Sequence, residues 1–197
     1  MKLLHLSDTH GCHRRLTALP EADIVVHSGD FTLGGSQAEA LDFLEWFCEL
    51  PHPHKIFIAG NHDECLYGGR VEGLDPNVHY LCNSGVEVCG LRFYGVPMFL
   101  ADCVSERQER NYDAIPAGID VLVTHTPPYG VLDFDDGIHY GSPELFRRLM
   151  EVLPQWHLFG HIHACRGVRT LQGVTCSNGA ILGAGYDRIM APNLFEW

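Results

Sequence analysis

Basic residues are scarce in this chain of 197 residues, which holds 13 Lys and Arg against 25 Asp and Glu. The formal net charge is −12 with histidine counted as neutral. Because phosphate backbones are held by basic surface patches, this balance argues against a general nucleic-acid-binding surface or a DNA nuclease. An anionic substrate held at a bound metal ion remains compatible with it, since a local cation reverses the local field.

Long apolar runs and Cys-x-x-Cys pairs are also missing from the sequence. A helix that spans a membrane needs about 20 mostly apolar residues in a row, so we expect no membrane segment. Asp8 follows Met1 too early for the apolar core of a signal peptide. We therefore expect a reduced, cytoplasmic protein whose eight cysteines are mostly small core residues.

No internal repeat or low-complexity linker interrupts the chain, so we expect a single domain over residues 1–197. Ser36 and Glu39 have the spacing of a capping box and predict a helix, and Pro143 predicts the first position of another. Residues 98–114 show no strong period, and we expect an active-site loop or short cap there. Strands are expected over residues 2–6, 22–27, 56–59, 119–123 and 156–159, and short strands in hairpins over 78–96 and 168–197.

This order of elements predicts a mixed α/β fold, with two packed mixed sheets flanked by helices. Five of the expected strands end in side chains that are common metal ligands. Since ligands bind outside the carboxyl ends of strands in open α/β sheets, these ends indicate one shared site. The clusters are Asp8 with His10, Asp30, Asn61 with His62, His125, and His161 with His163.

Each of these residues alone has an ordinary structural explanation. Asp30 after a glycine is a common turn residue, and Asn61 could cap a turn. Their joint occurrence at five strand ends favours a metal site instead. Carboxylate, imidazole and amide oxygen ligands suit divalent ions such as Mn²⁺, Fe²⁺ or Zn²⁺. If seven ligands serve two ions, one carboxylate must bridge them, which gives a clamp for displacement at phosphorus.

The clusters, taken in order, resemble the five sequence blocks of the calcineurin-like metallophosphoesterases. The local wording at Gly29-Asp30-Phe31-Thr32, residues 55–62 and residues 120–128 is most similar to the MPPED-like subgroup. The resemblance implies a four-layer α-β-β-α sandwich. The matching blocks are Asp8-x-His10, Gly29-Asp30, Gly60-Asn61-His62-Asp63, Thr124-His125 and Gly160-His161-Ile162-His163.

The resemblance also implies a role for each matching residue. Asp30 bridges two divalent ions, of which the first block and His163 hold one and the remaining ligands hold the other. His62 is the catalytic residue, acting on the leaving-group oxygen as general acid or charge stabiliser while a metal-bridging hydroxide attacks phosphorus in line. The implied metal ligands are Asp8, His10, Asp30, Asn61, His125, His161 and His163.

We expect a phosphodiesterase that cleaves small phosphodiesters or cyclic nucleotides, as some relatives of the MPPED kind do. A phosphomonoesterase, or a non-catalytic interaction module on the same fold, is the alternative; the unbroken ligand set favours an enzyme. The phosphoprotein-phosphatase branch carries an acid and an Arg soon after its Gly-Asp, whereas Phe31 and Thr32 follow here. No partner that would orient His62 is visible, and Asp63 is a poor candidate for that task.

Two residues beside the blocks, His13 and Arg166, are candidates for binding the substrate, a small phosphate ester. Other histidines have structural interpretations: His5 and His27 are expected in the core or on a sheet face. The shape of the substrate pocket depends on residues 98–114 and 128–141. Oligomeric state is left open, a homodimer included. Surface or loop positions are expected for His52, His54, His79 and His157.

Overall fold

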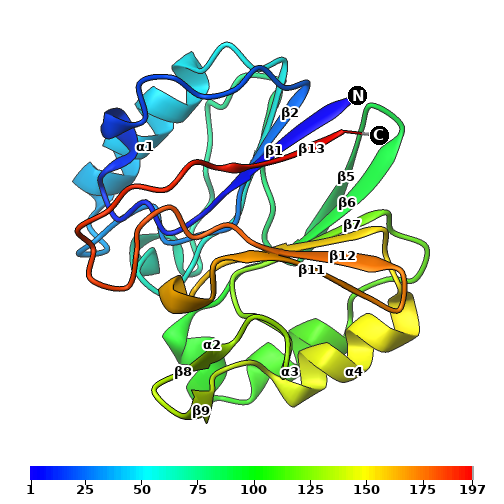
Figure 1. The fold of residues 1–197 in the computed structure, drawn as a ribbon. Helices are drawn as coiled ribbons and strands as arrows, with labels where there is room; N and C mark the ends of the chain where they lie inside the picture. Colours follow the sequence, from blue (N-terminus) through cyan, green and yellow to red (C-terminus); the bar gives the residue numbers. More distant parts are fainter. Residues whose placement is uncertain (197) are drawn as a thin grey trace.

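The computed structural model describes residues 1–196 and has two mixed β-sheets packed face to face, with helices on their outer sides (Figure 1). The first sheet has the strand order β13-β1-β2-β3-β4. All neighbouring pairs in it are parallel except β13 with β1. Its strands are β1 (Lys2–Leu6), β2 (Ile24–His27), β3 (His54–Phe57), β4 (Val78–Tyr80) and β13 (Asn193–Glu196).

The second sheet has the order β11-β12-β10-β7-β6-β5. Its two outer pairs are antiparallel hairpins, while β12, β10, β7 and β6 run parallel to one another. The mixed α/β fold expected from the sequence is therefore confirmed. The strands are β5 (Ser84–Val88), β6 (Leu91–Val96), β7 (Val121–Thr124), β10 (Trp156–Phe159), β11 (Gly167–Leu171) and β12 (Val174–Asn178).

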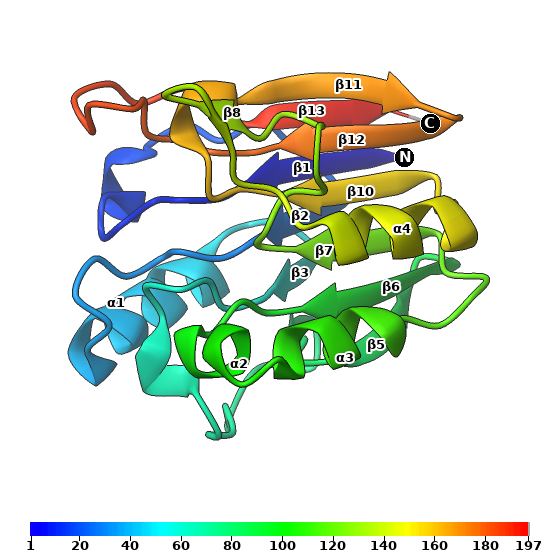
Figure 2. The same cartoon turned by 90° about the horizontal axis from the view of Figure 1, so that it is seen from below.

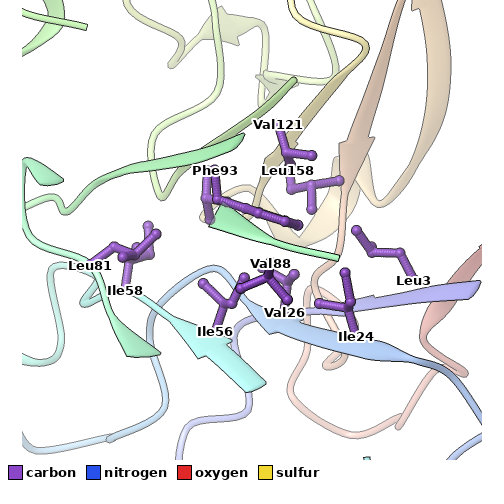
Figure 3. Packing of buried hydrophobic residues seen from close by; sticks show 11 residues of the cluster. Leu3, Ile24, Val26, Ile56, Ile58, Leu81, Val88, Phe93, Val121 and Leu158 are labelled. Atoms are coloured by element: carbon purple, nitrogen blue, oxygen red, sulfur yellow. The ribbon is translucent and has the colours of Figure 1, made fainter. Parts of the chain in front are cut away.

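Apolar side chains that alternate along the strands build the core. Leu3 points into the space between the sheets, while its neighbour Leu4 packs on the opposite face, under helix α1 (Gln37–Glu49). Figure 3 shows side chains of both sheets, among them Val26 and Leu158, meeting in the central layer. Helix α4 (Pro143–Val152) covers the outer face of the second sheet through buried residues such as Leu149.

The capping box at the start of α1 is confirmed. The Ser36 hydroxyl accepts a hydrogen bond from the Glu39 N–H at 3.2 Å, and the Ser36 N–H donates to the Glu39 carboxylate at 3.0 Å. Of the loop or short cap expected over residues 98–114, an irregular loop is not what forms, because helices α2 (Leu100–Val104) and α3 (Arg107–Asp113) lie there. Helix α2 is only five residues long and α3 is largely polar, so neither leaves a strong apolar period in the sequence.

Three further expectations need correction. Strand β4 does not form an antiparallel hairpin; it pairs in parallel with β3, since the chain crosses back between them. His157 and His52 are buried rather than exposed, with His157 Nε2 lying 2.9 Å from the Thr124 hydroxyl. Of the eight cysteines, all free, only Cys176 is buried. Short segments complete the chain: η1 (His13–Arg15), η2 (Glu64–Leu66), β8 (Phe134–Asp135), β9 (Ile138–His139) and η3 (His163–Cys165).

The two sheets are joined where their parallel strands end. Ser7, just after β1, forms a parallel bridge with Ala180, just after β12. Its N–H donates to the Gly179 carbonyl, and its carbonyl accepts from the Ile181 N–H, both at 2.9 Å. The carboxyl ends of the parallel strands in both sheets therefore meet along one side of the molecule, on the left in Figure 2. Within residues 1–196, no helix is long and apolar enough to cross a bilayer.

Candidate metal centre

The carboxyl ends of β1, β2, β3, β7 and β10 carry the clusters that the sequence singled out. Three overlapping groups of side chains come close enough to share a metal ion, with ligand atoms within 4.8 Å of one another. His10 and Asp30 each belong to two of the groups, so the three form one continuous site. The groups are Asp8, His10 and His163; His10, Asp30 and His62; and Asp30, His125 and His161.

Asp30 lies between the two halves of this site. Its Oδ2 atom is 3.1 Å from His125 Nε2 on one side and 3.8 Å from His10 Nε2 on the other. On the His10 side, His163 Nε2 lies 3.2 Å from His10 Nε2 and 3.6 Å from Asp8 Oδ1. A carboxylate in this position can reach an ion in either half, which is the geometry that a bridging ligand requires.

Main-chain carbonyl groups orient three of the histidines. Nδ1 of His125 lies 2.8 Å from the Ser28 carbonyl, and Nδ1 of His163 lies 3.0 Å from the Leu182 carbonyl. His10 makes the same kind of contact, at 3.2 Å, with the carbonyl of residue 32. Because a carbonyl only accepts hydrogen bonds, each Nδ1 carries a proton, and each Nε2 is left facing the centre as the atom available to a metal ion.

The backbone around the ligands is unusual. Four predicted ligands have φ in the left-handed region, which non-glycine residues adopt infrequently and at a cost in free energy: Asp8 at 54°, His10 at 40°, Asp30 at 57° and His161 at 72°. Three glycines that adjoin ligands, Gly29, Gly60 and Gly160, have no room for a side chain. A Cβ on Gly160 would collide with Asp8 Oδ2. The turns thus hold the carboxylates against the backbone at the cost of strain.

A proton balances charge between His125 and Asp30. Burial by itself lowers the pKa of His125, but the adjacent Asp30 carboxylate outweighs it and raises this pKa to about 10. Burial would raise the pKa of Asp30, and the neighbouring His125 and His10 instead hold it below its ordinary range. His161 has no such partner of equal strength, so burial lowers its pKa to about 4. Positive charge is therefore needed beside Asp30.

The residues present fit divalent metal ions. The Asn61 Oδ1 atom is buried without a hydrogen-bond partner, which is costly unless another group binds it. Two buried carboxylates stand among imidazoles whose Nε2 atoms face the centre, and a bound cation would take the place of the proton on His125 Nε2. Oxygen and imidazole donors of this kind suit borderline divalent ions.

His62 lies at the edge of the centre, with its ring edge-on to His10 at 4.7 Å between centroids. Its Nδ1 atom lies 2.8 Å from the Leu33 carbonyl, which therefore orients the ring. The Thr32 hydroxyl donates to the His62 carbonyl at 2.6 Å and fixes the main chain. Sequence reasoning missed this partner because a main-chain carbonyl leaves no residue-type signature. The catalytic role of His62 stays a prediction.

Asp63 has a structural task that the sequence did not disclose. Its buried carboxylate accepts hydrogen bonds from the N–H groups of Asp30 and Gly60, both at 2.8 Å, and of Thr32 at 2.9 Å. Burial and the nearby Asp30 charge raise its pKa to about 7. Asp63 thus ties the turn after β2 to the turn after β3. This role is recognised from the several N–H groups that donate to one carboxylate, and these come together only in the folded chain, so the sequence could not show it.

The two predicted substrate contacts lie outside the central group. His13 is fully buried, with Nε2 2.9 Å from Asp42 and its ring 5.1 Å from that of Trp46. Arg166 donates to Asn193 Oδ1 at 3.0 Å. It lines a cavity of about 390 Å³ that also reaches His163. In this conformation His13 has no exposed surface for a substrate, whereas Arg166 lies beside the centre without pointing a free guanidinium into it.

The fold and the site together define a metallophosphoesterase. The family model "Calcineurin-like phosphoesterase" matches residues 1–165, and the chain belongs to this family. Two relatives place it with the MPPED-like subgroup. It is 36% identical to UPF0046 protein C25E10.12 of Caenorhabditis elegans, over 96% of this chain and 80% of that protein. It is 32% identical to human Metallophosphoesterase domain-containing protein 1, over 97% of this chain and 69% of that protein.

The fold is also that of solved structures. One crystal structure superposes with a TM-score of 0.63 at 15% sequence identity, covering 90% of this chain and 89% of the other. At that identity the likeness concerns the fold alone. The sandwich of two mixed sheets expected from the sequence is thus confirmed, and the family makes the protein a metal-dependent phosphoesterase.

Proposed function

We propose that this protein is a binuclear metal-dependent phosphodiesterase acting on small phosphodiesters, cyclic nucleotides included. The observation that carries the proposal is the position of Asp30. Its carboxylate lies within 4 Å of an imidazole in each half of the site, His125 at 3.1 Å and His10 at 3.8 Å. Two ligand groups that share one carboxylate have the arrangement of a two-ion clamp.

The residues would divide the ions between them as the family pattern implies. Asp8, His10 and His163 would hold one ion, Asn61, His125 and His161 the other, and Asp30 both. When bound, such ions neutralise charge on phosphoryl oxygens and lower the pKa of bound water. The mixed oxygen and imidazole set accepts Mn²⁺, Fe²⁺ or Zn²⁺.

His62 is suited to protonate the leaving group. In the protonated form both ring nitrogens carry hydrogen, and Nδ1–H donates to the Leu33 carbonyl at 2.8 Å. The second nitrogen then directs its N–H away from that carbonyl, on the side where the ring meets His10. A proton held there can pass to the oxygen that leaves phosphorus, and the imidazole that remains keeps its hydrogen bond to Leu33.

A substrate panel tests the proposal. Protein loaded separately with Mn²⁺, Fe²⁺, Ni²⁺ or Zn²⁺ would be given aryl phosphate diesters, aryl monoesters, and 2′,3′- and 3′,5′-cyclic nucleotides. We expect faster turnover of diesters than of monoesters, with two ions per chain by elemental analysis. The Asp30→Ala variant, treated with the same metals, is the control and should hold neither ion. Absence of turnover with every metal would support the interaction-module alternative, and faster monoester turnover would support a phosphomonoesterase.

A further inference from the structure

A tight hairpin outside the ligand blocks lies against the metal-ligand histidines. Leu182 and Ile189 form an antiparallel bridge, and the Gly183 N–H donates to the Arg188 carbonyl at 3.0 Å. We call residues 182–189 the 182–189 hairpin; it belongs to the red-orange loop on the left of Figure 1. A second hydrogen bond, from the Tyr186 N–H to the Gly183 carbonyl at 2.8 Å, fixes the main chain at its tip.

Tyr186 lies at that tip and covers one half of the centre. Its ring stacks on His163 at 4.7 Å between centroids, with the planes 29° apart, and lies 5.0 Å from the ring of His10. Its φ of 57° is in the left-handed region, which is unfavourable for an aromatic residue. Backbone strain of this kind persists only where surrounding contacts impose it, and it clusters at functional sites.

The hairpin contacts His163 in a second way. The Leu182 carbonyl lies 3.0 Å from His163 Nδ1 and orients the imidazole that Tyr186 stacks upon. Tyr186 is therefore carried by the same short segment that positions a predicted metal ligand. Tyr186 is 44% exposed, so one side of its ring faces His163 and His10 while part of the residue is open to an incoming molecule.

The hydroxyl of Tyr186 lies 3.5 Å from His10 Nε2, at the upper limit of a hydrogen bond. His10 Nδ1 faces a carbonyl, so Nε2 acts as the acceptor and Tyr186 as the donor. An ion bound at His10 Nε2 would occupy the lone pair that the hydroxyl now uses. The hydroxyl would then need another acceptor, and the acceptors brought to this site by a phosphate ester are its phosphoryl oxygens.

We propose that Tyr186 is a substrate-binding residue whose hydroxyl donates a hydrogen bond to a phosphoryl oxygen of the ester. This inference rests on the proposed phosphodiesterase function, because it needs an ester at the metal centre. The aromatic face closes the His10 and His163 half against water, while the exposed side leaves room for the organic group of the substrate.

Tyr186→Phe tests the assignment, since it removes the hydroxyl and keeps the stacked ring. The Mn²⁺-loaded variant would be titrated with inorganic phosphate by calorimetry, and kcat and KM would be measured with a bis-aryl phosphate. We expect phosphate affinity to fall by about three- to tenfold, the range of one hydrogen bond, with a matching rise in KM. Metal content should equal that of the wild type.

Tyr94→Phe is the matched control, because Tyr94 is half-buried in β6, outside the ligand groups and outside both segments expected to shape the pocket. It should leave phosphate affinity unchanged. If Tyr186→Phe binds phosphate as the wild type does, the assignment is wrong while the proposed function stands. Loss of an ion in Tyr186→Phe would make the phenol a metal ligand and also overturn it. A wild type that holds metal but neither binds phosphate nor turns over diesters overturns both proposals.

Discussion

His62 and Asp63 are adjacent in the chain and have separate tasks. His62 contacts the Leu33 carbonyl and faces His10 at the edge of the centre. Asp63 points the other way and is saturated by N–H groups from the turn after β2. The chain turns here, with the Asp63 N–H donating to the Gly60 carbonyl at 3.1 Å, and this turn separates two residues that look like one cluster in the sequence.

We predict that His62→Ala keeps both metal ions and loses most turnover. The reason is that general acid–base groups contribute typically about 10²–10⁴ in rate. The two groups that lack His62 stay complete without this imidazole: Asp8, His10 and His163, and Asp30, His125 and His161. Elemental analysis would measure the metal, and stopped-flow or steady-state assays would measure kcat.

A substrate with a very acidic leaving group gives the matching control. Because such a group leaves without a proton, its turnover should fall much less in His62→Ala than that of an alkyl diester. Loss of an ion in the variant would contradict this prediction and make His62 a metal ligand together with its neighbours His10 and Asp30.

At the scale of the element, the turn after β10 is packed closely against the turn after β1 in the other sheet. Gly160 follows β10, and a side chain there would meet the carboxylate of Asp8 after β1. The two residues belong to different sheets, joined here by hydrogen bonds from the His161 N–H to Asp8 at 3.0 and 3.1 Å. Glycine is required because the other sheet's ligand occupies the space.

We predict that Gly160→Ala lowers metal affinity at least tenfold and destabilises the fold by about 1–3 kcal/mol, the usual cost of an overpacked site. The added methyl would displace Asp8, since it would overlap the Oδ2 atom of that carboxylate. Calorimetric metal titration and chemical denaturation would measure the two effects.

Gly69→Ala is the control, because its Cβ would meet the Leu66 carbonyl at an ordinary 3.5 Å. It should change neither quantity by a measurable amount. Wild-type metal affinity in Gly160→Ala would show that the turn after β10 can move without disturbing Asp8.

Elements could be predicted from the sequence where an apolar pattern or a capping motif marks them. Strand β1 is a mostly apolar run that ends shortly before Asp8, and α1 begins at a capping box, so both were predictable. Helix α3 buries only Gln108 and Tyr112 and leaves too faint a period. The Leu33 carbonyl and the contacts of Tyr186 depend on segments brought together by the fold, so residue type carried no information about them.

At the scale of the whole molecule, several histidines are buried as neutral groups. Burial lowers the pKa of His5 and of His157 to about 3, and lowers that of His27 well below its ordinary value. In the unfolded chain each returns to about 6.5. The unfolded state therefore binds more protons below this pH, and acid favours unfolding.

We predict that the metal-free protein keeps the stability associated with these histidines above about pH 6.5 and loses it as the pH falls. The loss approaches about 1.4 kcal/mol per pH unit for each histidine. Urea denaturation between pH 7.5 and 5 would measure it.

The His157→Gln variant removes one of the histidines that take up a proton on unfolding. The Thr124 hydroxyl donates to the Thr126 carbonyl at 2.6 Å, and the glutamine amide can replace His157 as its other polar partner. In this variant one proton fewer is taken up on unfolding, so the slope of unfolding free energy against pH should fall by up to about 1.4 kcal/mol per pH unit. An unchanged slope would mean that His157 does not take up a proton on unfolding in this range.

The parallel bridge between Ser7 and Ala180 has a consequence for biosynthesis. Predicted ligands of one ion come from residues 8 and 163, which follow strands β1 and β10 of different sheets. The two residues are far apart in the sequence and meet only when nearly the whole chain has been made and folded. An ion therefore cannot bind to all these ligands on a nascent polypeptide. The apoprotein must first bring its two sheets together through apolar packing. Metal acquisition is then the last step of maturation, and the cell supplies ions to a protein that is already folded.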